Sequence, residues 1–221
     1  MINYIKGQVP GDEYFWDLFD NGDWEAELLQ LLAYKLKPDS VYVDIGSWIG
    51  PTVLTAAQYS DHVYAVEPDE VAYPALLKNI EANPLLAPKI STDKLAIMNY
   101  NGWADLGVQG EEGNSMSSVL SHETTKRVRC IILSNYLRYK QIDKVDMIKI
   151  DTEGAELYIL PQLAAIWKDI GEPTIHLSIH KAFFKKERDI DIVTDFLDCF
   201  NVGDKVKRSI QTEDFNTIIL P

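Results

Sequence analysis

The chain has 221 residues, of which 46% are hydrophobic and 25% charged, the balance of a globular protein long enough to bury a sizeable core. Its 34 acidic and 21 basic side chains give a formal net charge of −13, and a surface of that sign disfavours nucleic acid and anionic membranes as partners. We expect a cytoplasmic protein, because the sequence shows no apolar run of the roughly 18 residues that a membrane span needs, no signal-peptide pattern, and only two distant cysteines.

The first half of the chain alternates helical and strand patterns. Residues 1–23 are rich in aromatic and acidic side chains, and we expect either a helical lead-in packed on the core or a lid over a site. Apolar residues at helical spacing predict a helix over 24–37, with acids in its first turn and lysines in its last, as the helix dipole favours. Strands are predicted at 41–46 and 62–69, and helices at 51–60 and 71–83.

The second half continues this alternation. We predict strands at 90–97, 127–135, within 143–156, 173–180, 202–210 and 216–220, a loop or irregular hairpin at 99–121, and helices at 155–170 and 185–200. Strands that alternate with helices at this spacing form a parallel sheet with helices on its faces. No repeat, low-complexity tract or linker interrupts the chain. We therefore expect one α/β domain over residues 1–221.

Ligands of open parallel α/β sheets bind beyond the carboxyl ends of the strands, so the turn D-I-G-S-W-I-G after the first strand is informative. Gly46 permits a sharp turn, and Gly50 permits close packing of the next helix or close approach of a ligand. A dinucleotide site would have G-x-G-x-x-G, whereas this turn has two glycines, the bulky Trp48 and a preceding anion, Asp44. The turn favours a ligand with a positive group over a diphosphate, and a plain strand-to-helix corner is the alternative.

Glu67 lies 21 residues after Gly46, at the end of the second strand. In nucleoside-binding βαβ units, an acid at this place accepts hydrogen bonds from both ribose hydroxyls. Together with the turn, it describes a site for a nucleoside with a cationic tail. S-adenosylmethionine fits that description better than NAD, although Glu67 could also be an exposed strand-end residue.

The chain resembles a known family over about residues 24–160. The matching stretches, in order, are W-E-A-E, V-D-I-G-S-W-I-G, V-Y-A-V-E-P-D, L-L-K-N-I-E-A-N, S-S-V-L and D-M-I-K-I-D-T-E-G-A-E. They resemble the FkbM-type methyltransferases, a branch of the class I S-adenosylmethionine-dependent enzymes, and the last string is the most specific. The resemblance implies a three-layer α/β sandwich with a Rossmann-like, mostly parallel sheet of seven strands and helices on both faces.

The resemblance also implies roles for individual residues. It assigns cofactor binding to Asp44, Gly46, Ser47, Gly50, Glu67, Pro68 and Asp151. Three departures from the family pattern are present. Trp48 stands where the family has a small polar residue, and Ser134 follows Leu133 where the family has Asp. The strand H-L-S-I-H stands where the family has a strand that contains Glu. Trp48 could narrow the methionine end of the pocket, and the other two lie toward the expected acceptor side.

Three acids follow the strand in K-I-D-T-E-G-A-E. Asp151 ends the strand, and by resemblance lies near donor and acceptor, where it could orient or deprotonate an acceptor hydroxyl. Glu153 and Glu156 are three residues apart, so we expect them to share one face of a first helical turn and contact substrate. The alternative for them is a capped helix start with solvated acids.

His176, Ser178 and His180 alternate along a predicted strand and so point to one face. His180, at the strand end, could act as a general base, because the ordinary pKa of histidine is near neutral. A structural histidine is the alternative, and we expect no metal site.

We therefore expect a methyltransferase that moves a methyl group from S-adenosylmethionine to a hydroxyl oxygen of a small molecule or glycan, with Asp151 or His180 as base. An inactive methyltransferase-like binding module is an alternative, which a pocket filled by Trp48 would favour. An NAD-dependent oxidoreductase is a further one. The sequence leaves the acceptor and the oligomeric state open.

Overall fold

The computed structural model describes residues 2–3, 12–108, 117–119, 125–181, 184, 187–200 and 215–220. The helices are α1 (Asp12–Asn21), α2 (Ala26–Lys35), α3 (Pro51–Ala56), α4 (Ala72–Glu81), α5 (Leu133–Lys140), α6 (Glu156–Ile166) and α7 (Glu187–Asp198), with one 3₁₀ turn, η1 (Ala87–Lys89). The strands are β1 (Val41–Ile45), β2 (His62–Val66), β3 (Ile90–Asp93), β4 (Ala96–Ile97), β5 (Gly102–Val108), β6 (Ser117–Ser118), β7 (Thr125–Ile131), β8 (Met147–Ile150), β9 (Thr174–His180) and β10 (Phe215–Leu220). Over these residues, every helix is too short or too polar to cross a bilayer.

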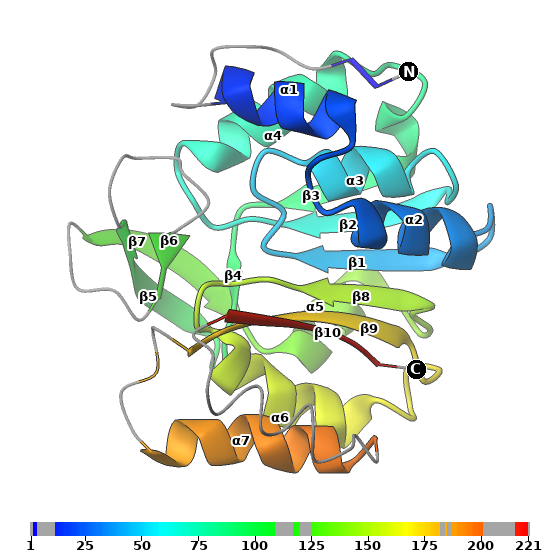
Figure 1. Cartoon of the computed structure of the whole chain (residues 1–221). Coiled ribbons are helices and arrows are strands. Elements are labelled where there is room, and N and C mark those ends of the chain that lie inside the picture. The colour runs from blue at the N-terminus through cyan, green and yellow to red at the C-terminus, as the bar shows by residue number, and fades with distance from the viewer. Residues whose placement is uncertain are drawn as a thin grey trace.

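A six-stranded sheet occupies the middle of the molecule, in the order β10-β9-β8-β1-β2-β3 (Figure 1). Its neighbouring strands are parallel except for β10, which pairs antiparallel with β9. Parallel strands bring their carboxyl ends to one edge of a sheet. The residues that follow β1, β2, β8 and β9 therefore meet at one place, as the sequence predicted.

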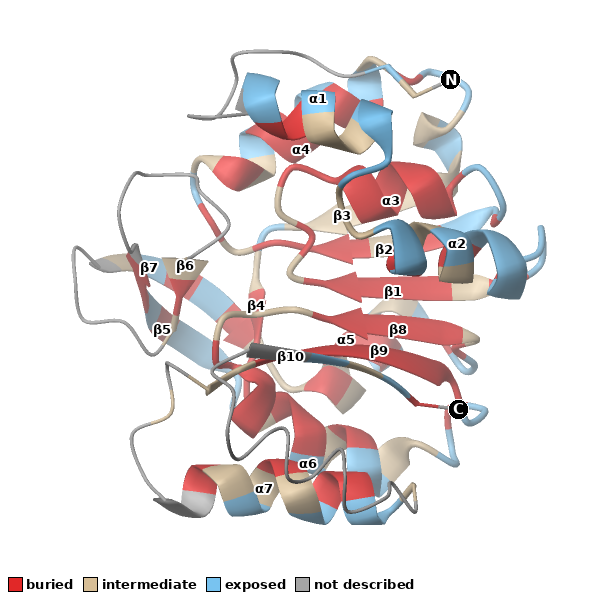
Figure 2. Ribbon diagram, in the orientation of Figure 1, coloured by how far each residue is buried: buried red, intermediate tan, exposed pale blue. Residues whose placement is uncertain are grey.

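The sheet separates two apolar clusters. Alternation along β1 sends Tyr42 to one face and Val43 and Ile45 to the other. Residues of α1, α2, α3 and α4 pack on the Tyr42 face, and residues of α5, α6 and α7 pack on the opposite face. Figure 2 shows the central strands buried between these helices, whose outer sides are exposed. The three-layer α/β sandwich is thus confirmed.

The expected count of seven strands is not reached in the described part of the main sheet, which has six. The strand predicted at 202–210 lies outside the described residues. Its neighbour in the tail, predicted at 216–220, is present as β10 and forms an edge of the sheet.

A second sheet, in the order β4-β7-β5-β6, corrects the prediction for residues 90–135. The predicted strand at 90–97 divides into β3 and β4, because the chain turns where the Leu95 N–H donates to the Asp93 carbonyl at 3.1 Å. The segment 99–121, predicted as a loop or irregular hairpin, contains β5, whose antiparallel pairing with β6 agrees with the hairpin alternative, and β5 also pairs antiparallel with β7. The strand expected at 127–135 ends at Ile131, and α5 begins at Leu133.

Candidate functional site

A cavity of about 310 Å³ opens at the carboxyl edge of the main sheet. Its wall comes from the turns after β1, β2 and β8, from the end of β9, from the second sheet, and from the residues around α1 and the start of α2. Of the residues predicted for the site, the wall includes Gly46, Ser47, Glu67, Pro68, Asp151, Glu153 and His180. Asp44, Gly50 and Glu156 lie outside this wall.

The turn after β1 holds its shape through contacts within the protein. Gly46 has φ +85°, and a Cβ there would lie 1.8 Å from the carbonyl oxygen of Asp151, so a glycine is needed for the approach of the chain after β8. A Cβ on Gly50 would lie 2.5 Å from a methyl carbon of Leu76 in α4. Of the two roles considered for Gly50, the structure shows close helix packing.

Asp44 is fully buried and faces protein groups instead of the cavity. Its Oδ2 accepts hydrogen bonds from the hydroxyls of Tyr42 at 3.0 Å and Thr52 at 2.5 Å, and its Oδ1 lies 3.5 Å from Lys149 Nζ. The inference that Asp44 itself faces a positive group of the ligand needs correction, because the cation beside it belongs to the protein.

Lys149 lines the cavity but was not predicted as a site residue. In the sheet it pairs with Asp44 of β1 and with His176 of β9, so these three side chains share a face. Its Nζ donates to the Gly46 carbonyl at 3.0 Å and lies 3.2 Å from Asp151 Oδ2. Burial alone would lower the pKa of Lys149, but the charges of Asp151 and Asp44 raise it well above its ordinary value. A charged residue inside the apolar strand M-I-K-I was the available signal.

Glu67 lies at the end of β2, where its carboxylate joins two turns. Oε2 accepts from the Trp48 N–H and Oε1 from the Asp69 N–H, both at 2.8 Å. Burial raises the pKa of Glu67 to about 7, even though these two amides favour the charged form. Each oxygen keeps a second lone pair, so the carboxylate can still accept from a ligand that enters the cavity.

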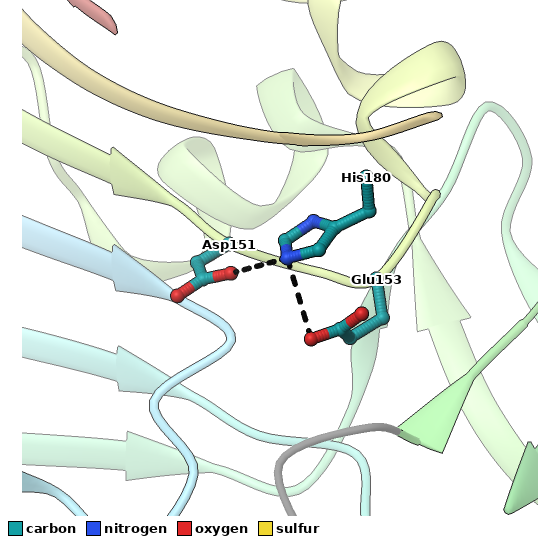
Figure 3. A group of neighbouring side chains, drawn as sticks. All are labelled: Asp151, Glu153 and His180. Atoms are coloured by element: carbon teal, nitrogen blue, oxygen red, sulfur yellow. Dashed lines mark ion pairs between the residues drawn. The ribbon is translucent and has the colours of Figure 1, made fainter. Parts of the chain in front are cut away.

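Asp151, Glu153 and His180 meet at the polar end of the cavity (Figure 3). His180 Nε2 lies 3.5 Å from Asp151 Oδ1 and 3.3 Å from Glu153 Oε1, and its Nδ1 lies 3.3 Å from Glu156 Oε1. Glu153 has φ +51°, a left-handed conformation that is unfavourable for a side chain of this kind. Its carbonyl accepts a hydrogen bond from the Ser118 hydroxyl, which ties the turn to the second sheet.

The three groups of this cluster differ in how they hold a proton. Burial alone would lower the pKa of His180, but the hydrogen bond to Glu156 and the nearby carboxylates raise it to about 9. Burial would raise the pKa of Asp151, but Lys149 and His180 lower it below its ordinary value. Burial raises the pKa of Glu153 to about 7, against the opposing charge of His180. At neutral pH, His180 is therefore an imidazolium beside an ionised Asp151.

The ligand atoms of Asp151, Glu153 and His180 lie within 4.8 Å of one another, a spacing that a bound cation could bridge. An imidazolium supplies positive charge at the same place, because Nε2 of His180 forms ion pairs with Asp151 and Glu153 while Nδ1 is hydrogen-bonded to Glu156. The positive charge that this cluster needs is thus available from His180 itself.

Glu156 differs from the expected substrate contact. It is fully buried at the start of α6, where Oε1 accepts from the Thr152 N–H at 2.9 Å and Oε2 from the Gly154 N–H at 2.8 Å. Glu153 precedes the helix, so the two acids do not share a face of its first turn. Glu156 holds the turn that leads into α6 and contacts His180 Nδ1, and it is buried where the alternative expected a solvated acid.

His176 and Ser178 are buried on β9, on the same face of the strand as His180. Burial lowers the pKa of His176 to about 4, and Lys149 adds to this effect. A neutral, buried His176 outside the cavity wall fits a structural histidine.

Aromatic residues form one side of the cavity. The Phe15 ring lies edge-on to those of Trp24 and Trp48, with centroids 5.1 Å and 4.6 Å away. Phe15 of the lead-in therefore packs on the turn after β1 and also lines the cavity, whereas closure of the lead-in as a lid stays a prediction. Trp48 lines the cavity without filling it.

The opposite side of the cavity is apolar. It is formed by the segment after β3 and by the second sheet. The apolar residues that line it are Leu95, Ala96, Ile97, Leu106 and Val119. Glu67 lies between this apolar side and the charged cluster at the ends of β8 and β9.

Comparisons with known proteins show the family and the fold of the chain. The sequence profile described as methyltransferase FkbM domain matches residues 42–206. Methyltransferase FkbM from Methylobacillus flagellatus has a similar structure, with a TM-score of 0.51, 14% identity, and coverage of 82% of this chain and 54% of that one. The chain thus spans about half the length of that protein, and the likeness shows a shared fold.

Two further solved structures are similar at lower TM-scores. One is a protein from Streptococcus mutans in complex with SAH, with a TM-score of 0.49, 10% identity, and coverage of 80% of this chain and 81% of that one. The other is a precorrin-6y C5,15-methyltransferase from Geobacter metallireducens. Its TM-score is 0.43 and its identity 14%, with coverage of 80% of this chain and 66% of that one. Comparison with curated protein sequences gives no match.

Proposed function

The chain belongs to the FkbM methyltransferase family, and we propose on this basis that it transfers a methyl group from S-adenosylmethionine to a hydroxyl oxygen of a small molecule or glycan. We also propose that residues 1–221 work as one domain, because one sheet contributes to both apolar clusters.

The order of chemical groups along the cavity supports this proposal most. An apolar side, suited to an adenine ring, is followed by Glu67, whose carboxylate can accept from ribose hydroxyls. Beyond Glu67 come Gly46 and Ser47, and then Asp151. A nucleoside with an amino acid tail fits this sequence of surfaces, and its sulfonium would lie toward the cluster at the ends of β8 and β9.

Methyl transfer to oxygen is an in-line displacement at a donor that is already activated by its positive charge. The protein's main contribution is to align donor and nucleophile in a cavity that excludes water. A base then removes the hydroxyl proton as the new bond forms. We assign this role to Glu153, because its carboxylate lines the cavity and a base is most effective when its pKa lies near the working pH.

Asp151 and His180 then take other roles. Asp151 stays ionised and is held by Lys149, so we assign it to orienting the donor or the acceptor hydroxyl. His180 is protonated at neutral pH and therefore unsuited to accept a proton, although the sequence made it a candidate base. Its imidazolium holds the carboxylates of Asp151 and Glu153 in place.

The alternative of an inactive binding module has less support. That alternative would be favoured by Trp48 filling the pocket, whereas about 310 Å³ stays open beside it. An NAD-dependent oxidoreductase would require a third glycine in the turn after β1, which D-I-G-S-W-I-G lacks.

The proposed function is tested by calorimetric titration with S-adenosylmethionine, S-adenosylhomocysteine and NAD, followed by a screen for transfer of a labelled methyl group to glycans and small alcohols. We expect binding of the two sulfur ligands, none of NAD, and label on an oxygen of the product. Binding of NAD alone, or labelling on nitrogen or carbon, would contradict the proposal.

A further inference from the structure

The motif W-E-A-E contains Glu25, an acid that lines the cavity. Glu25 immediately precedes α2, with φ +40° and ψ +40°, a left-handed conformation that costs a residue with a side chain roughly 1 kcal/mol or more. The Glu25 carbonyl accepts from the Leu29 N–H at 3.1 Å, which starts the helix. Its side chain makes no capping bond, so helix formation does not explain the choice of an acid here.

The carboxylate of Glu25 lines the cavity with one oxygen that has no donor. Its Oε2 is buried and without a hydrogen-bond partner among the described residues. Asp69 offers a contrast, since one of its oxygens accepts from the Val71 and Ala72 N–H groups and the other from the Ser117 hydroxyl. With no donor to Oε2 among the described residues and with burial raising its pKa to about 7, the charged form of Glu25 is unfavourable in the empty cavity, and a cationic group bound beside the carboxylate would stabilise it.

We propose that Glu25 binds the α-ammonium group of the methyl donor, an inference that rests on the proposed function. The ammonium carries a positive charge and three N–H donors, which match an acid that lines the cavity and makes no capping bond. Asp44 is not available for this contact, because Tyr42, Thr52 and Lys149 occupy its carboxylate.

The surroundings of Glu25 agree with a cationic ligand group in this part of the cavity. Charges of Lys149, Asp151 and Asp44 act on Glu25, which places it by the turn after β1, where the tail of the donor would lie. Phe15, Trp24 and Trp48 line the same side, and aromatic faces attract cations. Acid and rings together form a receptor for a positive group.

The inference is tested with a pair of ligands that differ only in the amino acid tail. S-adenosylhomocysteine carries the ammonium, and 5′-methylthioadenosine has the same nucleoside and thioether without it. Calorimetry is done with the wild-type protein, Glu25→Gln, and the control Glu27→Gln, an exposed acid two residues further in α2. We expect Glu25→Gln to weaken S-adenosylhomocysteine about 10- to 100-fold and to leave 5′-methylthioadenosine unchanged.

The thermal midpoint of each variant completes the test. Burial raises the pKa of Glu25 to about 7, so its ionised form is unfavourable in the folded protein, and we expect the neutral variant Glu25→Gln to have a midpoint equal to or above that of the wild type. Equal loss of both ligands, loss of neither, or a lowered midpoint would each overturn the role of Glu25. A wild-type protein that binds neither ligand would instead refute the proposed function, and this inference with it.

Discussion

At the scale of single residues, carboxylates of the same chemistry differ around this cavity because their partners differ. Asp44 and Glu156 are fully buried and accept only from protein groups, so they support the turn after β1 and the start of α6. Glu67 and Glu153 keep access to the cavity. The sequence could place Asp44 and Glu67 at strand ends and Glu153 and Glu156 at a helix start, but only the folded chain shows which of them have all their oxygens turned to protein groups.

The assignment of Glu153 as base predicts a bell-shaped pH profile. Once an acceptor is identified, kcat/KM should rise through about pH 7 as Glu153 loses its proton and fall near pH 9 as the His180 imidazolium loses its own. Glu153→Gln should lower kcat about 10²- to 10⁴-fold and remove the rise near pH 7. Glu172→Gln is a matched control, because Glu172 is exposed and has a similar backbone conformation, with φ +55°.

The same experiment separates the other candidates for the base. Near-wild-type turnover in Glu153→Gln would exclude Glu153. If Asp151→Asn then showed the loss of turnover without weaker cofactor binding, Asp151 would be the base in its place, because an interaction made only in the transition state affects kcat.

Glu67 predicts a loss of affinity combined with a loss of stability. Glu67→Ala removes an acceptor for the ribose, and we expect S-adenosylhomocysteine to bind about 2 kcal/mol more weakly by calorimetry. It also leaves the buried Asp69 N–H and the Trp48 N–H without their acceptor, so the thermal midpoint should fall. Unchanged affinity would remove Glu67 from the ribose site even if the midpoint fell.

The charge of His180 predicts that chelation has no effect. Because the imidazolium already satisfies Asp151 and Glu153, we expect EDTA to leave both S-adenosylhomocysteine affinity and the thermal midpoint unchanged. A midpoint that rises with added Mn²⁺ and returns with EDTA would show that a cation bridges these three side chains instead.

At the scale of elements, the strands and helices with clear periodicity were predictable, and those that depend on distant partners were not. Helix α2 and strands β1 and β2 lie within their predicted ranges, because apolar spacing and turn residues mark them locally. Strand β5 lies in a segment predicted only as a loop or irregular hairpin, because its neighbours are rich in glycine and polar residues. Its alternation, with Ala104 and Leu106 buried and Trp103 exposed, was the signal available in the sequence.

The turn after β1 lies so close to the chain after β8 that we expect any side chain at Gly46 to destabilise the folded protein strongly. Gly46→Ala would place a Cβ 1.8 Å from a backbone oxygen, which cannot move aside as a flexible side chain could, so the fold itself should lose stability by several degrees or more in thermal midpoint. Gly22→Ala is a matched control, since its φ is +76° and a Cβ there meets nothing within 4 Å. We expect Gly22→Ala to cost only about 1 kcal/mol for its backbone conformation. Equal midpoints for the two variants would contradict this account of Gly46.

At the scale of the whole molecule, the cavity is lined by several acids, among them Glu25, Glu67 and Glu153. The net charge of −13 excluded polyanionic partners from the sequence alone. The sequence could not show that buried acids at the cavity hold protons near neutral pH, because the raised pKa values of Glu25, Glu67 and Glu153 come chiefly from burial. Stability of the whole protein should therefore depend on pH in the neutral range.

The sign of that dependence follows from each group. The folded state raises the pKa of His180 from 6.5 to about 9, so its contribution is complete below pH 6.5 and is lost as the pH rises through 9. Glu25, Glu67 and Glu153 change the stability in the same direction. Their pKa values rise from 4.5 to about 7 on folding, so the folded state binds more protons and loses stability as the pH rises from 4.5 through 7. His176, whose pKa falls to about 4, opposes these groups only below pH 6.5.

Above pH 6.5, all of these groups make the free energy of unfolding decrease with pH. We expect His180 alone to contribute about 3 kcal/mol between pH 6.5 and 9, which corresponds to several degrees in thermal midpoint for a chain of this size. Differential scanning fluorimetry across this range should show that decline in the wild type and in His62→Gln, a control at an exposed histidine. His180→Gln should have a lower midpoint at pH 6.5 and a flatter profile up to pH 9. A profile as steep as the wild type in His180→Gln would show that the imidazolium does not stabilise the folded state, and its role in holding Asp151 and Glu153 would be wrong.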